Sequence, residues 1–489
     1  MTGVRKALFI SLLDRYLVLV LALASSMILA RLLTPEQIGV YSVSLAVIGI
    51  AQVLRDFGIG NYLIQEKDLT EPQLRTAFGI SLLLGGVMFL PLFLTAPWVA
   101  DFYGDPRMVS TLRICSLNFI VLPFCSISLA LLRREMQFGR LLYVSLAAAL
   151  VNFTVTLGLA FTGYGPDSMA WGAVASNAAT GLGAHIARGR PAFLWPSLAE
   201  WRRVASFGGQ SALTSVVTSV SMDINDLALG KILGLAPVAL FSRAQGLVNL
   251  FNRELLGAVR NVLFPAFAKE HREGRAIEQQ HVHTVTLVTV LGWPFFGFLA
   301  LFPLEIMRLM YGPQWDSAAL LLPILALGGA LYCGASFVTS ALMAVGRMDL
   351  VTKLELIFQP VRAAAIVSTA WLTQSLAAAA WAYSAAMALQ IVLAFTFKQQ
   401  SIPTDWNRLS RGLARSALVS LLALMPALAL SLFHGWERTQ PVQSVVFIAA
   451  IVATILCWMV SLRLCRHALA REPLFSRTIG RLPGMRLPA

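Results

Sequence analysis

Long apolar runs alternate with short polar segments along almost the whole chain. Each run has about 20 predominantly apolar residues, the length that a helix needs to cross a hydrocarbon core of roughly 30 Å. Because these runs leave little sequence outside a bilayer, the pattern predicts an all-α polytopic membrane protein with about fourteen transmembrane helices. The expected spans are residues 8–33, 38–64, 77–99, 109–132, 141–162, 168–187, 204–233, 236–263, 282–309, 317–345, 350–372, 375–397, 412–433 and 442–463.

Two short segments occur twice along the chain. Residues 30–42 align without gaps with residues 230–242, and Phe102-Tyr103-Gly104 matches Met310-Tyr311-Gly312 six spans further on. Because six is an even number, both copies have the same orientation, which predicts a parallel repeat. Such a repeat either builds a bundle or encloses a substrate path between two halves, and the polar helices described below favour the path. The expected domains are a six-helix N-lobe (1–190), a six-helix C-lobe (191–400), two additional helices (401–465) and a basic tail (466–489).

Composition and charge agree with a membrane protein. The chain is 57% hydrophobic and 13% charged, with a mean hydropathy of +0.72, whereas soluble domains have roughly 45–50% apolar and about 25% charged residues. The net charge of +14 is compatible with nucleic-acid binding, but most of the 38 basic residues fall in loops on one side of the expected spans. This bias is the positive-inside pattern. It predicts cytoplasmic N- and C-termini, membrane lipids as neighbours and no nucleic-acid partner.

Polar residues form stripes on several expected spans. Tyr41, Ser44, Gln52 and Arg55 lie on one face of the span 38–64 at about 100° per residue. The span 204–233 carries many Ser, Thr, Asp and Asn residues, too many for a helix that faces lipid. A second stripe on the span 236–263 consists of Ser242, Gln245, Asn249, Arg253 and Arg260.

Charged residues inside the spans need an explanation, because an ionised group there costs at least about 2.5–3.5 kcal/mol unless it is paired or faces water. One explanation is ion pairing between helices, which suits Asp226 and Arg243 at similar depths. The other is a hydrated cavity in which arginines hold an anion by forked hydrogen bonds. The candidate substrate-binding residues are Arg15, Arg55, Arg253, Arg362, Gln52 and Asn249, and the candidates for ion coupling or structural pairing are Asp14, Asp223, Asp226 and Arg243.

Several classes of site have no counterpart in the sequence. There is no GxxxxGK[ST] phosphate loop and no HExxH motif, and the five cysteines lack metal-ligand spacing. His281 and His283 have no further ligands nearby in the sequence and are interpreted as solvated residues. We therefore expect no cofactor and no metal. Short loops also argue against a membrane glycosyltransferase or ligase, which needs extramembrane segments for its acids and bases.

Particular segments resemble the Wzx-type polysaccharide flippases of the multidrug/oligosaccharidyl-lipid/polysaccharide exporter superfamily. The similarity extends over about residues 5–400 and is greatest to the colanic-acid, teichuronic-acid and succinoglycan branch, while residues 401–465 match only in kind. The segments that carry it are Ile28–Tyr41, Asp56–Gly60, Leu63–Thr70, Phe102–Pro106, Leu131–Phe138, Asp226 with Leu229–Gly234, and Val262–Ala266.

This resemblance implies two six-helix lobes around a central cavity with alternating access, in a bacterial inner membrane. It implies a non-enzymatic flippase that moves undecaprenyl-diphosphate-linked oligosaccharide repeat units to the periplasmic leaflet for surface polysaccharide synthesis. A polysaccharide polymerase and a chain-length regulator are the implied protein partners. In relatives, basic residues on cavity helices serve the diphosphate. A cation-coupled multidrug exporter of the same superfamily is the alternative, and its cavity should be dominated by acids and aromatics.

Overall fold

The chain folds into α-helices, as seen in a computed structural model that describes residues 2–56, 59–66, 69–189, 195–199, 201, 223–435 and 438–472. Within these residues there is no β-strand. The helices divide into two compact units, Met1–Ala239 and Leu240–Ala489. The first unit includes the helical residues 223–232, and the expected division into lobes at residues 190, 400 and 465 stays a prediction.

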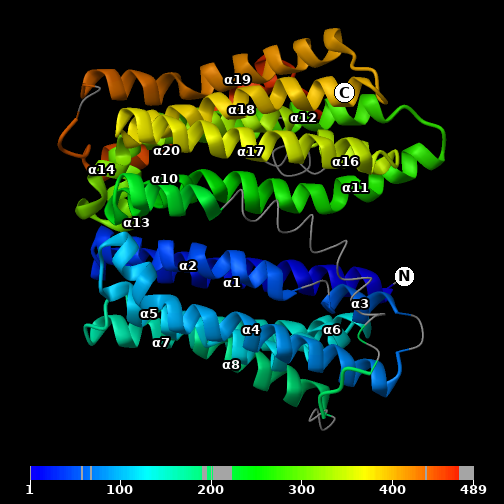
Figure 1. Cartoon of the computed structure of the whole chain (residues 1–489). Helices are drawn as coiled ribbons and strands as arrows, with labels where there is room; N and C mark the ends of the chain where they lie inside the picture. Colours follow the sequence, from blue (N-terminus) through cyan, green and yellow to red (C-terminus); the bar gives the residue numbers. More distant parts are fainter. Residues whose placement is uncertain are drawn as a thin grey trace. The chain divides into compact units, whose positions relative to one another are not determined.

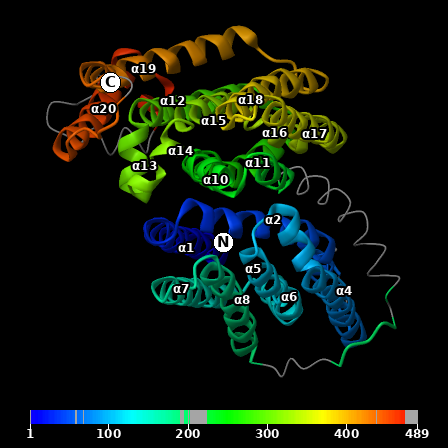
Figure 2. The same ribbon diagram turned by 60° about the vertical axis from the view of Figure 1, so that its left-hand side comes forward.

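The first unit is a bundle of long helices running side by side (Figure 1). In it α7 packs between α1 and α8, and α6 packs against α8 and α4, as Figure 2 shows from nearer the helix ends. Its helices are α1 (Thr2–Leu32), α2 (Pro35–Asp56), α3 (Ile59–Gln65), α4 (Glu71–Tyr103), α5 (Arg107–Ser116), α6 (Asn118–Arg134), α7 (Phe138–Phe161) and α8 (Pro166–Arg188).

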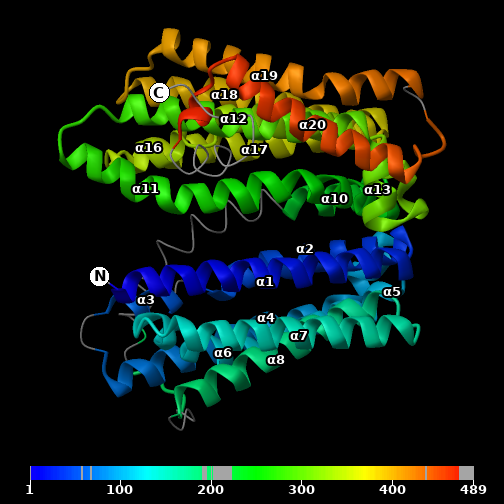
Figure 3. The same cartoon turned by 180° about the vertical axis from the view of Figure 1, so that it is seen from behind.

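The second unit is built around α12, which packs against α15 and α19, while α18 packs against α15 and α17. The last long helix, α20, lies along α19, as seen from behind in Figure 3. The elements of the second unit are α10 (Leu235–Asn249), of which residues 235–239 belong to the first unit, η1 (Leu250–Leu255), α11 (Leu256–Arg272), α12 (Ile277–Leu301), α13 (Pro303–Tyr311), η2 (Pro313–Trp315), α14 (Asp316–Ala319), α15 (Leu322–Ala335), α16 (Val338–Ala344), α17 (Met348–Thr373), α18 (Leu376–Gln399), α19 (Trp406–Phe433), α20 (Ser444–Leu464) and η3 (Ala468–Arg471).

The predicted fold class is confirmed. Ten helical segments among the described residues are long and apolar enough to cross a membrane. Every expected span except 204–233 coincides with one or more helices, and residues 204–222 of that span lie outside the described residues. Several spans are subdivided, as α5 and α6 are, because short breaks interrupt the helix without ending the apolar run.

The repeated Tyr-Gly motif ends a helix in each unit. Gly104 follows α4 with φ 75°, and Gly312 follows α13 with φ 99°. Glycine adopts positive φ without the steric cost that other residues incur. Near the first copy, the Arg107 guanidinium holds the pKa of the Asp105 carboxyl below its usual value, and near the second, Arg308 binds Asp316 at 2.6 Å. Both motif copies therefore end a helix at a glycine with positive φ, but Gly104 is left-handed (ψ 24°) whereas Gly312 is extended at ψ 174°.

A buried ion pair joins three helices at one end of the second unit. Lys398 of α18 is fully buried, and its Nζ donates to Glu278 of α12. The same ammonium donates to Thr404 Oγ1 at 3.1 Å, and Glu278 also accepts the backbone N–H of Asp405 at 3.0 Å. The ion pair and its hydrogen bonds therefore connect the turn between α18 and α19 to the start of α12.

His467 connects the segment after α20 to the interior of the second unit. Its Nε2 lies 3.1 Å from Ser416 Oγ, and its Nδ1 accepts the backbone N–H of Leu469 at 3.2 Å. Because Nδ1 accepts this hydrogen bond, it carries no proton, and the ring is neutral. Burial, with Arg415 and His283 nearby, lowers the pKa of His467 to about 4.

We expect the stability of the protein to fall as pH is lowered from about 6.5 towards 4, partly because of His467. The folded-state pKa lies below the unfolded value, so the unfolded chain binds the proton first and acid favours unfolding. Thermal unfolding of the purified protein in detergent, measured between pH 4 and 8, tests this. A His467→Ala variant should be less stable at neutral pH and less sensitive to acid; identical pH profiles for the two proteins would contradict the assignment.

The predicted topology places the loop between α7 and α8 outside and the loop between α11 and α12 inside. Tyr164 and Arg275 are exposed positions in these two loops. In intact spheroplasts, Tyr164→Cys should react with a membrane-impermeant maleimide, whereas Arg275→Cys should react only after permeabilisation. The wild-type protein, which has five cysteines of its own, is the control for background labelling. The opposite labelling at both sites would overturn the predicted orientation.

Candidate functional site

The polar stripe of α2 lies in the first unit. Gln52 is half-buried, and Arg55 is 5% exposed. The Arg55 guanidinium interacts electrostatically with Cys125 of α6, so it lies among the helices of this unit. Asp223 packs against α2, since a Cβ added to Gly49 would lie 2.6 Å from its carboxylate oxygen. Asp226 lies within electrostatic range of Asp223.

Asp14 and its neighbour Arg15 are half-buried on α1. The Asp14 carboxylate accepts a hydrogen bond from Ser145 of α7, which favours a structural role for this acid. Asp14 also lines a pocket of about 440 Å³, together with Arg133 and Thr180. The structure therefore directs Asp14 towards α7, and the role of Arg15 in binding stays a prediction.

Arg243 is held by aromatic residues of the second unit. Its guanidinium lies 5.3 Å from the ring centre of Tyr311 and 5.6 Å from that of Trp315. It also shares a hydrogen bond with Tyr311. Cation–π contacts of this kind stabilise a buried guanidinium. Asp226 belongs to the first unit and Arg243 to the second, so their pairing stays a prediction.

A π-helical segment divides the stripe that the sequence predicts on residues 236–263. Residues Leu250–Leu255 adopt this conformation between α10 and α11. Each π turn contains an extra residue, so the side chains after it are rotated relative to a regular α-helix. Asn249 is half-buried before the π segment, while Arg253 within it is exposed. The single face expected from regular periodicity is therefore divided into two parts.

Arg362 belongs to a polar cluster within the second unit. Tyr332 shares a hydrogen bond with Arg260, and Tyr383 shares one with Gln245. Arg362 lies within electrostatic range of Glu355 and both tyrosines. These residues come from α10, α11, α15, α17 and α18. We call the following set the polar cluster: Gln245, Arg260, Tyr332, Glu355, Gln359, Arg362 and Tyr383.

Helix α17 contributes three members of the polar cluster from one face. Glu355, Gln359 and Arg362 are spaced i, i+4 and i+7, which places them in line. Gln359 Nε2 donates to Glu355 Oε2 at 2.7 Å. On the opposite face, Ile357 and Val361 are 45% and 42% exposed. The polar face is therefore turned away from the face that is suited to lipid.

Close helix packing positions the tyrosines. A Cβ on Gly328 of α15 would lie 2.9 Å from Ser384 Oγ and 3.0 Å from the Tyr383 ring, so α18 approaches α15 closely only because this residue is glycine. Ser384 Oγ donates to the Ile324 carbonyl at 2.6 Å, which fixes the approach. Tyr332 lies one turn after Gly328 on the same face of α15.

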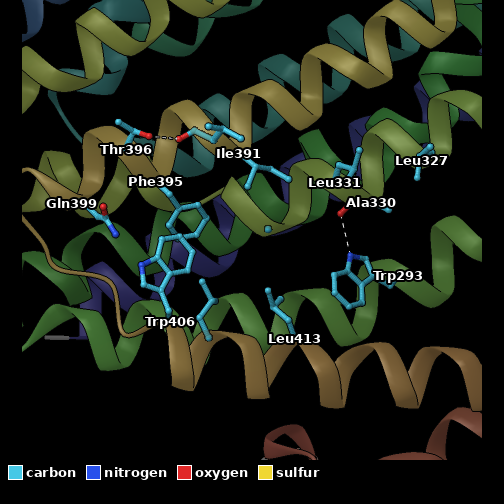
Figure 4. Close-up of a pocket in the computed structure, with 13 residues that line it drawn as sticks. Trp293, Leu327, Ala330, Leu331, Ile391, Phe395, Thr396, Gln399, Trp406 and Leu413 are labelled. Carbon is cyan, nitrogen blue, oxygen red and sulfur yellow. Dashed lines mark hydrogen bonds between the residues drawn. The ribbon is translucent and has the colours of Figure 1, made fainter.

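A large groove of the second unit has a different chemistry (Figure 4). It encloses about 710 Å³ between α12, α15, α18 and α19 and has a predominantly apolar lining. Trp293 Nε1 donates to the Ala330 carbonyl at 3.0 Å on one side, and Phe395 and Trp406 lie close together on the other. This groove has no charged lining residue, so it is unsuited to an anion.

Part of the polar cluster is predictable from the sequence. Arg362 is indicated by the cost of a charge in a span, and Gln245 and Arg260 lie on a predicted stripe but are not among the predicted binding residues. Tyr332, Glu355, Gln359 and Tyr383 are not among the predicted site residues. The spacing of Glu355, Gln359 and Arg362 was a usable signal, because it repeats at helical intervals.

Residues 28–320 match the family described as "Polysaccharide biosynthesis protein". The chain belongs to this family. The matched range includes Arg55, Arg253 and Arg260, whereas the polar residues of α17 lie beyond it. The sequence resemblance to polysaccharide exporters is thus confirmed at the level of the family.

Individual members of the polysaccharide family agree with this assignment. The lipopolysaccharide biosynthesis protein WzxC of Escherichia coli (strain K12) is 27% identical over 333 residues, which are 68% of each chain. The succinoglycan biosynthesis transport protein ExoT of Rhizobium meliloti (strain 1021) is 26% identical over 65% of each chain. The teichuronic acid biosynthesis protein TuaB of Bacillus subtilis (strain 168) is 24% identical over 61% of this chain and 62% of its own length. The last two alignments span slightly less than two thirds of the relatives.

Solved structures of transporters have the same fold. The lipid II flippase MurJ in an inward closed conformation gives a TM-score of 0.75 at 12% identity, over 94% of this chain and 98% of MurJ. An inward-facing MATE-family multidrug resistance transporter of the MOP superfamily gives 0.62 at 15% identity, over 78% and 94% of the two chains. This polysaccharide-family member is therefore a multi-pass membrane protein with a transporter fold.

Proposed function

We propose that this protein is a flippase that moves undecaprenyl-diphosphate-linked oligosaccharide repeat units from the cytoplasmic to the periplasmic leaflet of a bacterial inner membrane. Membership in the polysaccharide biosynthesis family supports a role in surface polysaccharide synthesis. One relative is named a succinoglycan biosynthesis transport protein, and a solved structure of the same fold is the lipid II flippase MurJ. Movement by alternating access, without covalent chemistry, is part of the proposal.

The observation that carries the proposal is the pair of arginines in the polar cluster. Arg260 and Arg362 come from two helices and lie with Tyr332 in one electrostatic network. Arginine forks bind phosphate oxygens by charge-assisted hydrogen bonds, which are stronger in a partly desolvated site. Arg15, Arg55 and Arg253, with Gln52 and Asn249, remain proposed contributors. Asp223 and Asp226 are proposed as the ion-coupling residues.

A deletion strain tests the proposed function. Loss of the gene should abolish surface polysaccharide and cause lipid-linked repeat units to accumulate in the inner leaflet, and the wild-type gene should restore export. Purified protein in proteoliposomes should make a lipid-linked oligosaccharide accessible on the opposite leaflet. Normal polysaccharide together with altered drug sensitivity would support a multidrug exporter instead. A change in the linkage or length of isolated repeat units would support an enzyme.

A further inference from the structure

We infer that the polar cluster is a sugar-binding subsite, which holds a hydroxyl-bearing ring next to the diphosphate of the transported lipid. This inference rests on the proposed function. It concerns seven residues of one unit: Gln245, Arg260, Tyr332, Glu355, Gln359, Arg362 and Tyr383.

Unsatisfied polar atoms in the polar cluster point to a ligand. Gln359 is 6% exposed, and its Nε2 donates a hydrogen bond to Glu355. Its Oε1 is buried and has no hydrogen-bond partner in the part of the chain that the structure describes. Arg260 Nε is likewise buried without an acceptor among the described residues. Buried polar atoms normally have a hydrogen-bond partner. A ligand could therefore donate a hydrogen bond to Gln359 Oε1 and accept one from Arg260 Nε.

The residue types fit hydroxyl groups better than a diphosphate alone. Glu355 lowers the positive potential around Arg362 and repels an anion, so a site for diphosphate only would be better without it. A carboxylate accepts hydrogen bonds from hydroxyls, and amide and phenol groups both donate and accept them. A sugar ring supplies several hydroxyls at once. The mixture of one acid, two amides and two phenols beside arginines therefore fits a glycosyl diphosphate.

The location of the polar cluster allows a ligand to reach it. Tyr332, Glu355 and Arg362 are partly exposed, whereas Gln359 and Tyr383 are buried. The cluster thus has a buried floor and an accessible edge. Because the exposed apolar side chains of α17 lie on its opposite face, this edge is not on the face suited to lipid.

Binding to two lipids tests the subsite. Undecaprenyl diphosphate and undecaprenyl diphosphate carrying one neutral hexose would be titrated against the full-length protein in nanodiscs. We expect the wild-type protein to bind the glycosylated lipid about tenfold more tightly. Glu355→Gln and Gln359→Leu should remove this preference and leave the affinity for undecaprenyl diphosphate within about twofold. Gln399→Leu, the same substitution at the exposed end of the apolar groove, should preserve the preference.

Arginine variants and folding controls make the outcome decisive. Arg362→Ala should weaken binding of both lipids, because it removes a phosphate contact. If Glu355→Gln or Gln359→Leu does not fold, Tyr383→Phe is tested in its place and should likewise lose the preference. This substitution keeps the ring against Phe241. Equal affinity of the wild-type protein for the two lipids would overturn the subsite alone, and binding of neither lipid would overturn the proposed function as well. A preference that survives in both Glu355→Gln and Gln359→Leu, or equal losses of affinity for both lipids in these two variants, would also overturn the subsite.

Discussion

Replacing Arg362 by alanine is expected to reduce export of the lipid-linked oligosaccharide at least about tenfold, with normal amounts of protein in the membrane. A charge-assisted hydrogen bond contributes roughly 1.5–3 kcal/mol, and the guanidinium can form two of them with a diphosphate. The side chain is half-buried on the polar face of α17, where solvent screens it less than at the surface. Surface polysaccharide in a complemented deletion strain, normalised to membrane protein, is the measurement.

Two further variants serve as controls for Arg362→Ala. Arg362→Lys should recover only part of the export, because an ammonium lacks the planar fork. Arg408→Ala removes an arginine whose side chain is 59% exposed and paired with Asp405, and it should leave export unchanged. Full export with Arg362→Ala would exclude Arg362 from the diphosphate site. Loss of the protein from the membrane would instead assign a structural role.

The largest effect on stability is expected from Lys398→Met. The substitution removes the ammonium and leaves the Glu278 carboxylate, which is 13% exposed, without its ionic partner. Breaking a buried ion pair in this way costs about 3–5 kcal/mol. The variant should unfold at a lower temperature in detergent and accumulate less in the membrane.

A second substitution separates the ion pair from simple packing. Adding Glu278→Gln to Lys398→Met should recover much of the lost stability, because no buried charge then remains. Arg75→Met, at an exposed i,i+4 pair with Glu71, should change the unfolding temperature little. If the double variant is as unstable as Lys398→Met alone, packing around Lys398 and not the charge accounts for the effect.

The fold class was predictable because it depends on local composition. The length of an apolar run determines whether a helix can span a bilayer, and that information is present in each segment separately. The family resemblance was also readable, since its residues lie in continuous segments such as Ile28–Tyr41. Neither inference needed knowledge of which helices are neighbours.

The contacts of individual side chains were not predictable in the same way. Glu278 and Lys398 are far apart in the sequence, and nothing local to either residue identifies its partner. Tyr332 and Tyr383 are ordinary residues for a membrane helix until the glycine contact between α15 and α18 places them near Arg362. Charge cost identified Arg362, because that penalty belongs to a single residue. Partners, in contrast, are a property of the packed bundle.

The π segment Leu250–Leu255 has a consequence for how this helix tolerates changes in length. In a loop, the loss of one residue shortens the connection. In this helix, the loss of one residue would convert the π turn into an ordinary α turn and rotate everything after it by about 100°. Arg260 would then point away from Tyr332, although the residue itself had not been substituted. Insertions and deletions here therefore act as rotations of a binding surface, and sequence length becomes a determinant of side-chain direction.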